Sequence, residues 1–158
     1  MRRAAVAGLL LLAAAGCGGR SAQPKDDPGA FAVKVVGMIA HNQYVRAWKD
    51  LHSRDQRVAP LAEYVGCELG NPVITAPTKM RVLAVSNESV GLGDGSFVPS
   101  KAVDVRLSFR GNFHVTHTVH LVAEHGRWKW ILTPWRFRDY RADLCPTNPD
   151  STPPPSSS

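Results

Sequence analysis

Residues 102–124, AVDVRLSFRGNFHVTHTVHLVAE, carry the pattern that decides the fold class of this chain. Apolar and polar residues alternate at the start of this stretch, with Val103 and Val105 on one face of an extended strand. Residues 110–112 (RGN) have the composition of a tight turn, and the alternation resumes over residues 113–124. The stretch therefore predicts two neighbouring antiparallel strands that bury one apolar face.

The pattern extends in both directions along the chain. Downstream, residues 127–132 alternate again, with Trp128 and Trp130 on one side. Upstream, residues 79–90 form a candidate strand whose alternation is weaker, and the glycine-rich residues 91–99 are expected to form a turn. Together these segments predict an antiparallel meander with one apolar face.

The first half of the chain has a helical period instead. Residues 31–52 place apolar side chains at nearly helical spacing, which predicts one long helix. A shorter helix is expected over residues 57–65, where Pro60 falls early enough to be tolerated in a first turn. Residues 69–78 are expected to connect the helices to the strands. Helices that precede a meander indicate an α+β fold, with the N-terminal helices packed on a curved antiparallel sheet.

The composition is that of one ordinary globular domain. The 158 residues are 44% hydrophobic and 20% charged, which is typical of a soluble fold. The formal net charge is +6, and the positive residues are scattered along the chain. A nucleic-acid-binding protein usually concentrates its positive charge on one face, so we expect no nucleic-acid partner.

The N-terminus has the layout of an export signal. After the basic start (MRR), residues 4–15 are apolar but too few to span a bilayer, which takes about 20 residues. The small residues that follow, together with Cys17, resemble the bacterial lipobox, although Ala14 replaces its usual leucine. This resemblance implies removal of residues 1–16 and attachment of palmitate or a related acyl chain to Cys17. The alternative is an ordinary secretory signal cleaved near Ala15 or later, with Cys17 incidental.

The lipobox resemblance implies an extracytoplasmic protein held on the lipid bilayer by acylated Cys17. Residues 17–29 are rich in Gly, Ser, Pro and charge, and we expect them to form a flexible tether. Residues 146–158 are rich in Pro, Ser and Thr, and we expect them to be disordered. The folded domain is therefore expected over residues 30–145. Two arginines are lost with the signal, so the net charge falls to about +4, since 6 − 2 = 4.

The cysteine count bears on the same question. Three cysteines are present, an odd number that is unusual in an exported protein. If Cys17 carries lipid, Cys67 and Cys145 remain, and an oxidising compartment favours a disulfide between them. The alternative is a nucleophilic or metal-binding thiol, but neither a Cys-x-x-Cys motif nor a histidine at ligand spacing accompanies these cysteines.

The order of a long helix, a short helix and a curved sheet is similar to the NTF2-like (cystatin-like cone) fold. The stretch AWKDLH at residues 47–52, with Gln56, and the stretch YVGCE at residues 64–68 resemble a pattern in exported actinobacterial-type lipoproteins of that family. The family usually has a proline after Leu-His, where this chain has Ser53. The resemblance covers residues 31–145. It implies a cone with a pocket but no particular reaction.

His117 is the central candidate in such a pocket. It lies on the apolar side of its strand, where it is either a general base or ligand contact, or a buried neutral histidine. The aromatic residues build either an open cavity or a well-filled core. The candidate pocket residues are Tyr44, Trp48, His117, Trp128 and Trp130. His114 and His120 face away from His117, so we expect no metal ion and no other cofactor.

The absence of a convincing inward-facing acid/base pair favours a non-enzymatic domain, which binds a small apolar ligand or an envelope protein. A rival hypothesis is a ketosteroid-isomerase-like or dehydratase-like enzyme that uses His117 with Tyr44 or Tyr64. A third hypothesis is an accessory module of a cell-wall or export complex.

Overall fold

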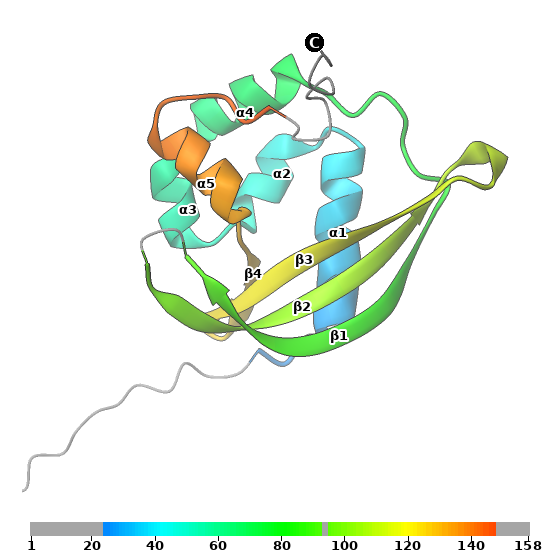
Figure 1. Cartoon of the computed structure of the whole chain (residues 1–158), viewed down its shortest axis with the longest axis horizontal. Helices are drawn as coiled ribbons and strands as arrows, with labels where there is room; N and C mark the ends of the chain where they lie inside the picture. The colour runs from blue at the N-terminus through cyan, green and yellow to red at the C-terminus, as the bar shows by residue number, and fades with distance from the viewer. Residues whose placement is uncertain (1–23, 93–94, 148–158) are drawn as a thin grey trace, which may run out of the picture.

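The computed structural model describes residues 24–92 and 95–147 (Figure 1). The expected signal peptide (residues 1–16), the expected acylation site Cys17, most of the expected tether and the chain beyond residue 147 lie outside the described residues. Within the described part of the chain, no helix has both the length and the apolar character that a membrane span requires.

Four segments form one antiparallel sheet, and they follow one another in the sheet as they do in the chain. They are β1 (Lys79–Gly91), β2 (Phe97–Ser108), β3 (His114–Glu124) and β4 (Arg127–Trp130). Figure 1 shows the long strands curving around the helices. Since most of the helical chain precedes the sheet, the expected α+β architecture is confirmed.

The β2–β3 hairpin contains the stretch whose alternation predicts the sheet. Val103 pairs with Val119, and Val105 pairs with His117. Val103 and Val105 are fully buried, so the apolar face of the hairpin is the face that packs on the helices. Gly111 lies in the turn with a φ of 79°, a left-handed conformation that glycine adopts at no steric cost.

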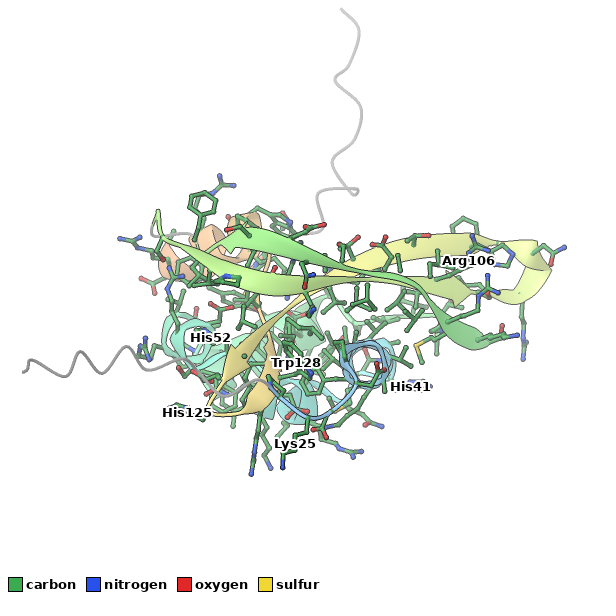
Figure 2. The ribbon with its side chains drawn as sticks, turned by 90° about the horizontal axis from the view of Figure 1, so that it is seen from below. Lys25, His41, His52, Arg106, His125 and Trp128 are labelled. Atoms are coloured by element: carbon green, nitrogen blue, oxygen red, sulfur yellow. A yellow bond between two sulfur atoms is a disulfide. The ribbon has the colours of Figure 1, made fainter. Side chains whose placement is uncertain are left out.

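The helices cover the concave face of this sheet (Figure 1). They are α1 (Pro28–Ala40), α2 (Tyr44–Lys49), α3 (Ser53–Val58), α4 (Leu61–Gly70) and α5 (Pro134–Arg141), and a 3-10 turn, η1 (Arg110–Asn112), closes the β2–β3 hairpin. α1 packs against all four strands. Seen from below, the sheet and the helices form two layers, with Arg106 on the sheet layer and His41 on the helical layer (Figure 2).

α1 begins at Pro28, inside the segment expected to be a tether. Two features of the sequence start the helix there. The Asp27 side chain accepts a hydrogen bond from the Ala30 N–H at 2.6 Å, and Pro28 suits a first helical position, where no N–H is needed. The ordered domain therefore starts earlier than residue 30.

The prediction of a single helix over residues 31–52 is wrong, because the chain forms two helices there, α1 and α2, with a break between them. Asn42 lies at the break with a φ of 55°, a left-handed conformation that ends a right-handed helix. Its side chain accepts a hydrogen bond from the Val73 N–H at 2.9 Å and donates one to the Val73 carbonyl at 3.1 Å. Asn42 therefore both ends α1 and anchors the connection between α4 and β1.

The prediction of one helix over residues 57–65 is also wrong, because the chain forms two helices there, α3 and α4. Pro60 lies between them as the N-cap of α4, because a residue without an N–H cannot continue α3. α5 has no counterpart among the expected elements and begins at Pro134. The turn expected over residues 91–99 is shorter, because β2 already begins at Phe97.

The two cysteines expected to pair, Cys67 and Cys145, form a disulfide with their Cα atoms 5.1 Å apart. The bond joins α4 to the segment after α5, across a sequence separation of 78 residues. Tyr64 of α4 also packs on Tyr140 of α5, with ring centroids 6.1 Å apart. A covalent bond and aromatic packing therefore hold α5 against the N-terminal helices.

Candidate binding groove

One edge of the sheet is uncovered along much of β3. β4 pairs only with residues 121–124 of β3. The last contact on this side is a hydrogen bond of 3.2 Å from the Ile131 N–H to the His120 carbonyl. The chain then leaves the sheet to form α5. Among the described residues, residues 114–119 therefore have β2 on one side and no strand on the other.

Two cavities lie along this edge. The larger has a volume of about 430 Å³ and lies between α1, β3 and residues 130–136. The smaller has a volume of about 170 Å³ and is lined by Leu107 of β2 and by the α4–β1 connection. Val36 and Ile39 of α1 and His117 of β3 line both cavities. The two cavities are therefore halves of one groove, which we call the β3-edge groove.

His117 stands between the two halves of the groove. Its position opposite Val105 places its ring on the concave side of the sheet. Part of its surface is open to the groove, yet the surrounding protein displaces enough water to lower the pKa of the ring by desolvation. The imidazole is therefore neutral at neutral pH and offers one donor and one acceptor to a ligand.

The end of the groove beside α5 is polar. Arg136 forms an ion pair with Glu68, which also accepts a hydrogen bond from the Tyr140 hydroxyl at 2.8 Å. Three buried atoms of groove-lining residues have no hydrogen-bond partner in the described part of the chain: His120 Nδ1, Thr133 Oγ1 and Arg136 Nε. An unpaired buried polar atom costs about 1–3 kcal/mol. This end therefore favours a ligand that supplies hydrogen-bonding atoms.

Two of the five candidate pocket residues, His117 and Trp130, line the groove. Trp130 donates a hydrogen bond from Nε1 to the Ala47 carbonyl at 2.8 Å, which fixes its indole against α2. The other three candidates line neither cavity: Tyr44, Trp48 and Trp128. The structure therefore brings together only part of the expected pocket.

The three remaining aromatic residues pack in the core, and their polar atoms bond elsewhere. The Tyr44 hydroxyl donates to Asn42 Oδ1 at 2.5 Å, and Trp48 Nε1 donates to the Ala59 carbonyl at 2.8 Å. Trp128 Nε1 donates to the Asp26 carbonyl at 2.7 Å, and Figure 2 shows Trp128 above Lys25, near the start of the described chain. Of the two interpretations of these aromatic residues, the structure matches the well-filled core.

The sequence pattern does not identify the helical residues that line the groove as part of a binding site. Val36 and Ile39 have the spacing of ordinary core positions in an amphipathic helix, so nothing marks them as part of a site. Arg136 belongs to α5, which the sequence pattern did not predict. Its pairing with Glu68 depends on the packing of α4 against α5, which is a property of the tertiary fold.

A second polar cluster surrounds the start of α3. Asp55 is 2% exposed and accepts a hydrogen bond from the Leu132 N–H at 2.7 Å, and burial raises its pKa to about 6. Burial acts to raise the pKa of Glu124 too, but hydrogen bonds from Ser53 and the charge of His52 lower it overall. The pKa of His52 is lowered, because burial outweighs the attraction of Glu124, 3.5 Å away.

This cluster is arranged as a helix cap and not as a catalytic triad. The Ser53 hydroxyl donates to the Glu124 carboxylate instead of to His52, so the histidine is not placed to take the serine proton. The Ser53 N–H also donates to Glu124, at 3.3 Å, which places a negative charge at the start of α3. Among the residues that the structure describes, no three His, Cys, Asp or Glu side chains are grouped as metal ligands.

Comparison of the chain with models of known protein families finds no match, and comparison with curated proteins finds none either. The geometry of the β3-edge groove is therefore the basis for assigning a function.

Proposed function

We propose that this chain is a lipid-anchored extracytoplasmic protein whose NTF2-like domain is a non-catalytic binding module. The observation that carries the proposal is the β3-edge groove, where an open strand edge faces the apolar side chains of Val36 and Ile39. In this proposal, acylated Cys17 holds the module on the bilayer. The groove then binds either a small apolar molecule or an apolar segment of an envelope protein.

The disulfide supports an extracytoplasmic location. A bond between Cys67 and Cys145 persists in an oxidising compartment and is rarely maintained in a reducing one. The export-type N-terminal sequence ending at Cys17 points to the same side of the membrane. The order of helices before a curved antiparallel sheet is compatible with an NTF2-like cone.

The residues lining the groove support binding over catalysis. The isomerase hypothesis requires a tyrosine that reaches the same substrate as His117. Tyr44 and Tyr64, which the isomerase hypothesis pairs with His117, are 2% and 1% exposed and line neither cavity. No Asp or Glu is among the described residues that line the two cavities. In this proposal His117 acts as a ligand contact.

A hydrophobic fluorescent probe tests the binding function. We expect the full-length chain carrying Cys17→Ser, purified without detergent, to bind anilinonaphthalene sulfonate saturably. Ile39 lines both cavities, so Ile39→Trp places a larger side chain in the groove and should weaken the signal. The control is Val45→Trp, because Val45 is 44% exposed and lines neither cavity. Equal binding by the parent and both tryptophan variants would contradict the proposal, and native mass spectrometry of the parent would identify any retained ligand.

Metabolic labelling tests the anchor separately. Cells that express the parent chain should incorporate a labelled fatty acid into it, and cells that express Cys17→Ser should not. The parent should also fractionate with membranes, and the variant should not. Equal labelling of the two chains would refute the anchor without affecting the groove.

A further inference from the structure

We infer that the β3-edge groove takes an extended segment of a partner protein, which adds to the sheet as a strand beside β3. The inference rests on the proposed binding function and names the class of partner. The segment that fits has apolar side chains at alternate positions and an acidic residue at one or both ends. The strand edge, the two cavities and the charge around them each support this partner.

The backbone of β3 has hydrogen-bonding groups free on its uncovered side. His120 directs its carbonyl oxygen to that side, where the Ile131 N–H binds it. Backbone groups alternate between the two sides of an antiparallel strand, so Thr118 and Thr116 direct their N–H and C=O groups to the same side. Within the described chain these groups have no backbone partner there, and both residues are exposed. Residues 114–119 extend about 20 Å at roughly 3.4 Å per residue, which matches a partner segment of similar length.

The two edges of the sheet differ in how they resist pairing. β1, at the opposite edge, carries a bulge at Leu83 and the charged side chains of Lys79 and Arg81, features that discourage strand addition. β3 pairs with β2 without a break in register. Residues 115–119 (VTHTV) contain no lysine and no proline, and four of them are β-branched. The β3 edge is therefore the one suited to pairing.

The cavities provide places for the side chains of an added strand. Successive side chains of a strand point to opposite faces, so every second residue of the segment faces the groove. Those residues enter the cavities on either side of His117, against Val36 and Ile39. In strand addition, main-chain hydrogen bonds give affinity and pockets for alternate side chains give specificity. The apolar surface continues at Val115 of β3 and at Phe113, the residue before β3, which are 39% and 61% exposed.

The charge around the groove selects a neutral or acidic segment. The ionisable side chains that line the two cavities are His117, His120 and Arg136. His117 is neutral at neutral pH, and the Glu88 carboxylate lies 4.0 Å from His120 Nδ1, so Arg136 carries the positive charge of the groove. Arg110 lies exposed in the turn that precedes β3. Because Glu68 already balances part of the Arg136 charge, one or two acidic residues in the segment are enough to match the groove.

A phage-displayed library of random nonapeptides, panned against the full-length chain carrying Cys17→Ser, tests the inference. Enriched peptides should alternate apolar and polar residues. Thr116→Pro removes an N–H from the open side while leaving the hydrogen bonds to β2 in place. Synthetic copies of the enriched peptides should bind this variant about tenfold or more weakly, whereas the matched control, Thr116→Ala, should bind as the parent does.

Hydrogen exchange provides a measurement that does not depend on the folding of the proline variant. Saturating peptide should slow exchange of the Thr116 and Thr118 amides about tenfold or more, because each amide gains a hydrogen bond. Amides at the β1 edge, such as those near Leu83, should exchange at an unchanged rate.

The outcomes separate this inference from the proposed function. If the enriched peptides bind Thr116→Pro as tightly as the parent, or if none is enriched while the fluorescent probe still binds, strand addition is wrong and the groove is a small-molecule site. If neither peptide nor probe binds, the proposed function fails as well. If the chain itself forms a dimer that Thr116→Pro dissociates, the occupant is a second copy and the inferred partner is wrong.

Discussion

At the scale of single residues, the buried carboxylate of Asp55 links pH to stability. Its pKa is raised from 3.8 to about 6, chiefly by burial, so the folded state keeps a proton that the unfolded chain releases at lower pH. Asp55 therefore contributes stability at acidic pH that is lost as the pH rises through about 6. His52 and His117 act in the opposite sense. Their lowered pKa values contribute stability above about 6.5 that is lost as the pH falls.

Substitution of Asp55 by asparagine isolates the first effect. The amide that replaces the carboxylate cannot ionise, but its oxygen can still accept the Leu132 N–H. We expect Asp55→Asn to be about as stable as the parent at pH 4 and more stable than the parent at pH 7.5. The difference at pH 7.5 should be roughly 3 kcal/mol at most, at about 1.4 kcal/mol per pKa unit. Urea unfolding at both pH values measures the difference. A pH-independent difference would contradict the assignment.

Asp55→Ala removes the acceptor instead of only the charge. At pH 4, where Asp55 is mostly neutral, we expect a loss of about 1–3 kcal/mol, because the buried Leu132 N–H is left without a partner. The same urea titration measures this loss. Asp55→Asn at pH 4 is the control and should unfold close to the parent.

At the scale of elements, Asn42 decides where α1 ends. We expect Asn42→Ala to destabilise the fold by about 2–4 kcal/mol, because it adds left-handed strain and removes the bonds to Val73 and Tyr44. Asn42→Gly loses the same bonds without the strain, so its cost should be about 1 kcal/mol smaller. Thermal unfolding measures both variants. Asn112→Gly is the control, because Asn112 has a φ of 61° but is exposed, and this variant should unfold near the parent temperature.

Glu124 shows how the end of a strand stabilises the start of a helix. The Glu124 carboxylate accepts hydrogen bonds from both the hydroxyl and the N–H of Ser53. Glu124→Gln removes its negative charge, so we expect the free energy of unfolding to fall by about 1 kcal/mol at pH 7. The pKa of Glu124 is lowered, so its contribution is present above about 4.5 and is lost as the pH falls further. Chemical unfolding at pH 7 and pH 3.5 should therefore show a difference that shrinks in acid. Glu88→Gln is the exposed control and should show little effect at either pH.

The elements also show which parts of the fold the sequence pattern could predict. The β2–β3 hairpin was predictable, because alternation and a turn are local signals and Val103 and Val105 lie on the buried face, as alternation requires. The break at Asn42 was not, because its bonds to Val73 join positions 31 residues apart. The groove was only partly predictable. The parity of its strand identified His117, but the open edge depends on where β4 ends.

At the scale of the whole molecule, the disulfide connects the N-terminal helices to the chain's last described segment. Closing a loop across 78 residues contributes about 4–5 kcal/mol in the chain-entropy model. We expect the double variant Cys67→Ser, Cys145→Ser to lose stability of that order. Urea unfolding of the parent with and without reductant measures the same quantity. A double variant as stable as the oxidised parent would show that the loop contributes nothing to stability.

The hydrogen bond from the Trp128 indole to the Asp26 carbonyl has a consequence for how the protein meets its partner. It fixes Asp26 against the domain, nine residues after Cys17. Fully extended, that stretch reaches about 30 Å. If Cys17 carries lipid, the domain stays within about this distance of the bilayer surface. A partner in the same membrane is then met by lateral diffusion in two dimensions, at an effective concentration that even a weak strand-to-strand contact can exploit.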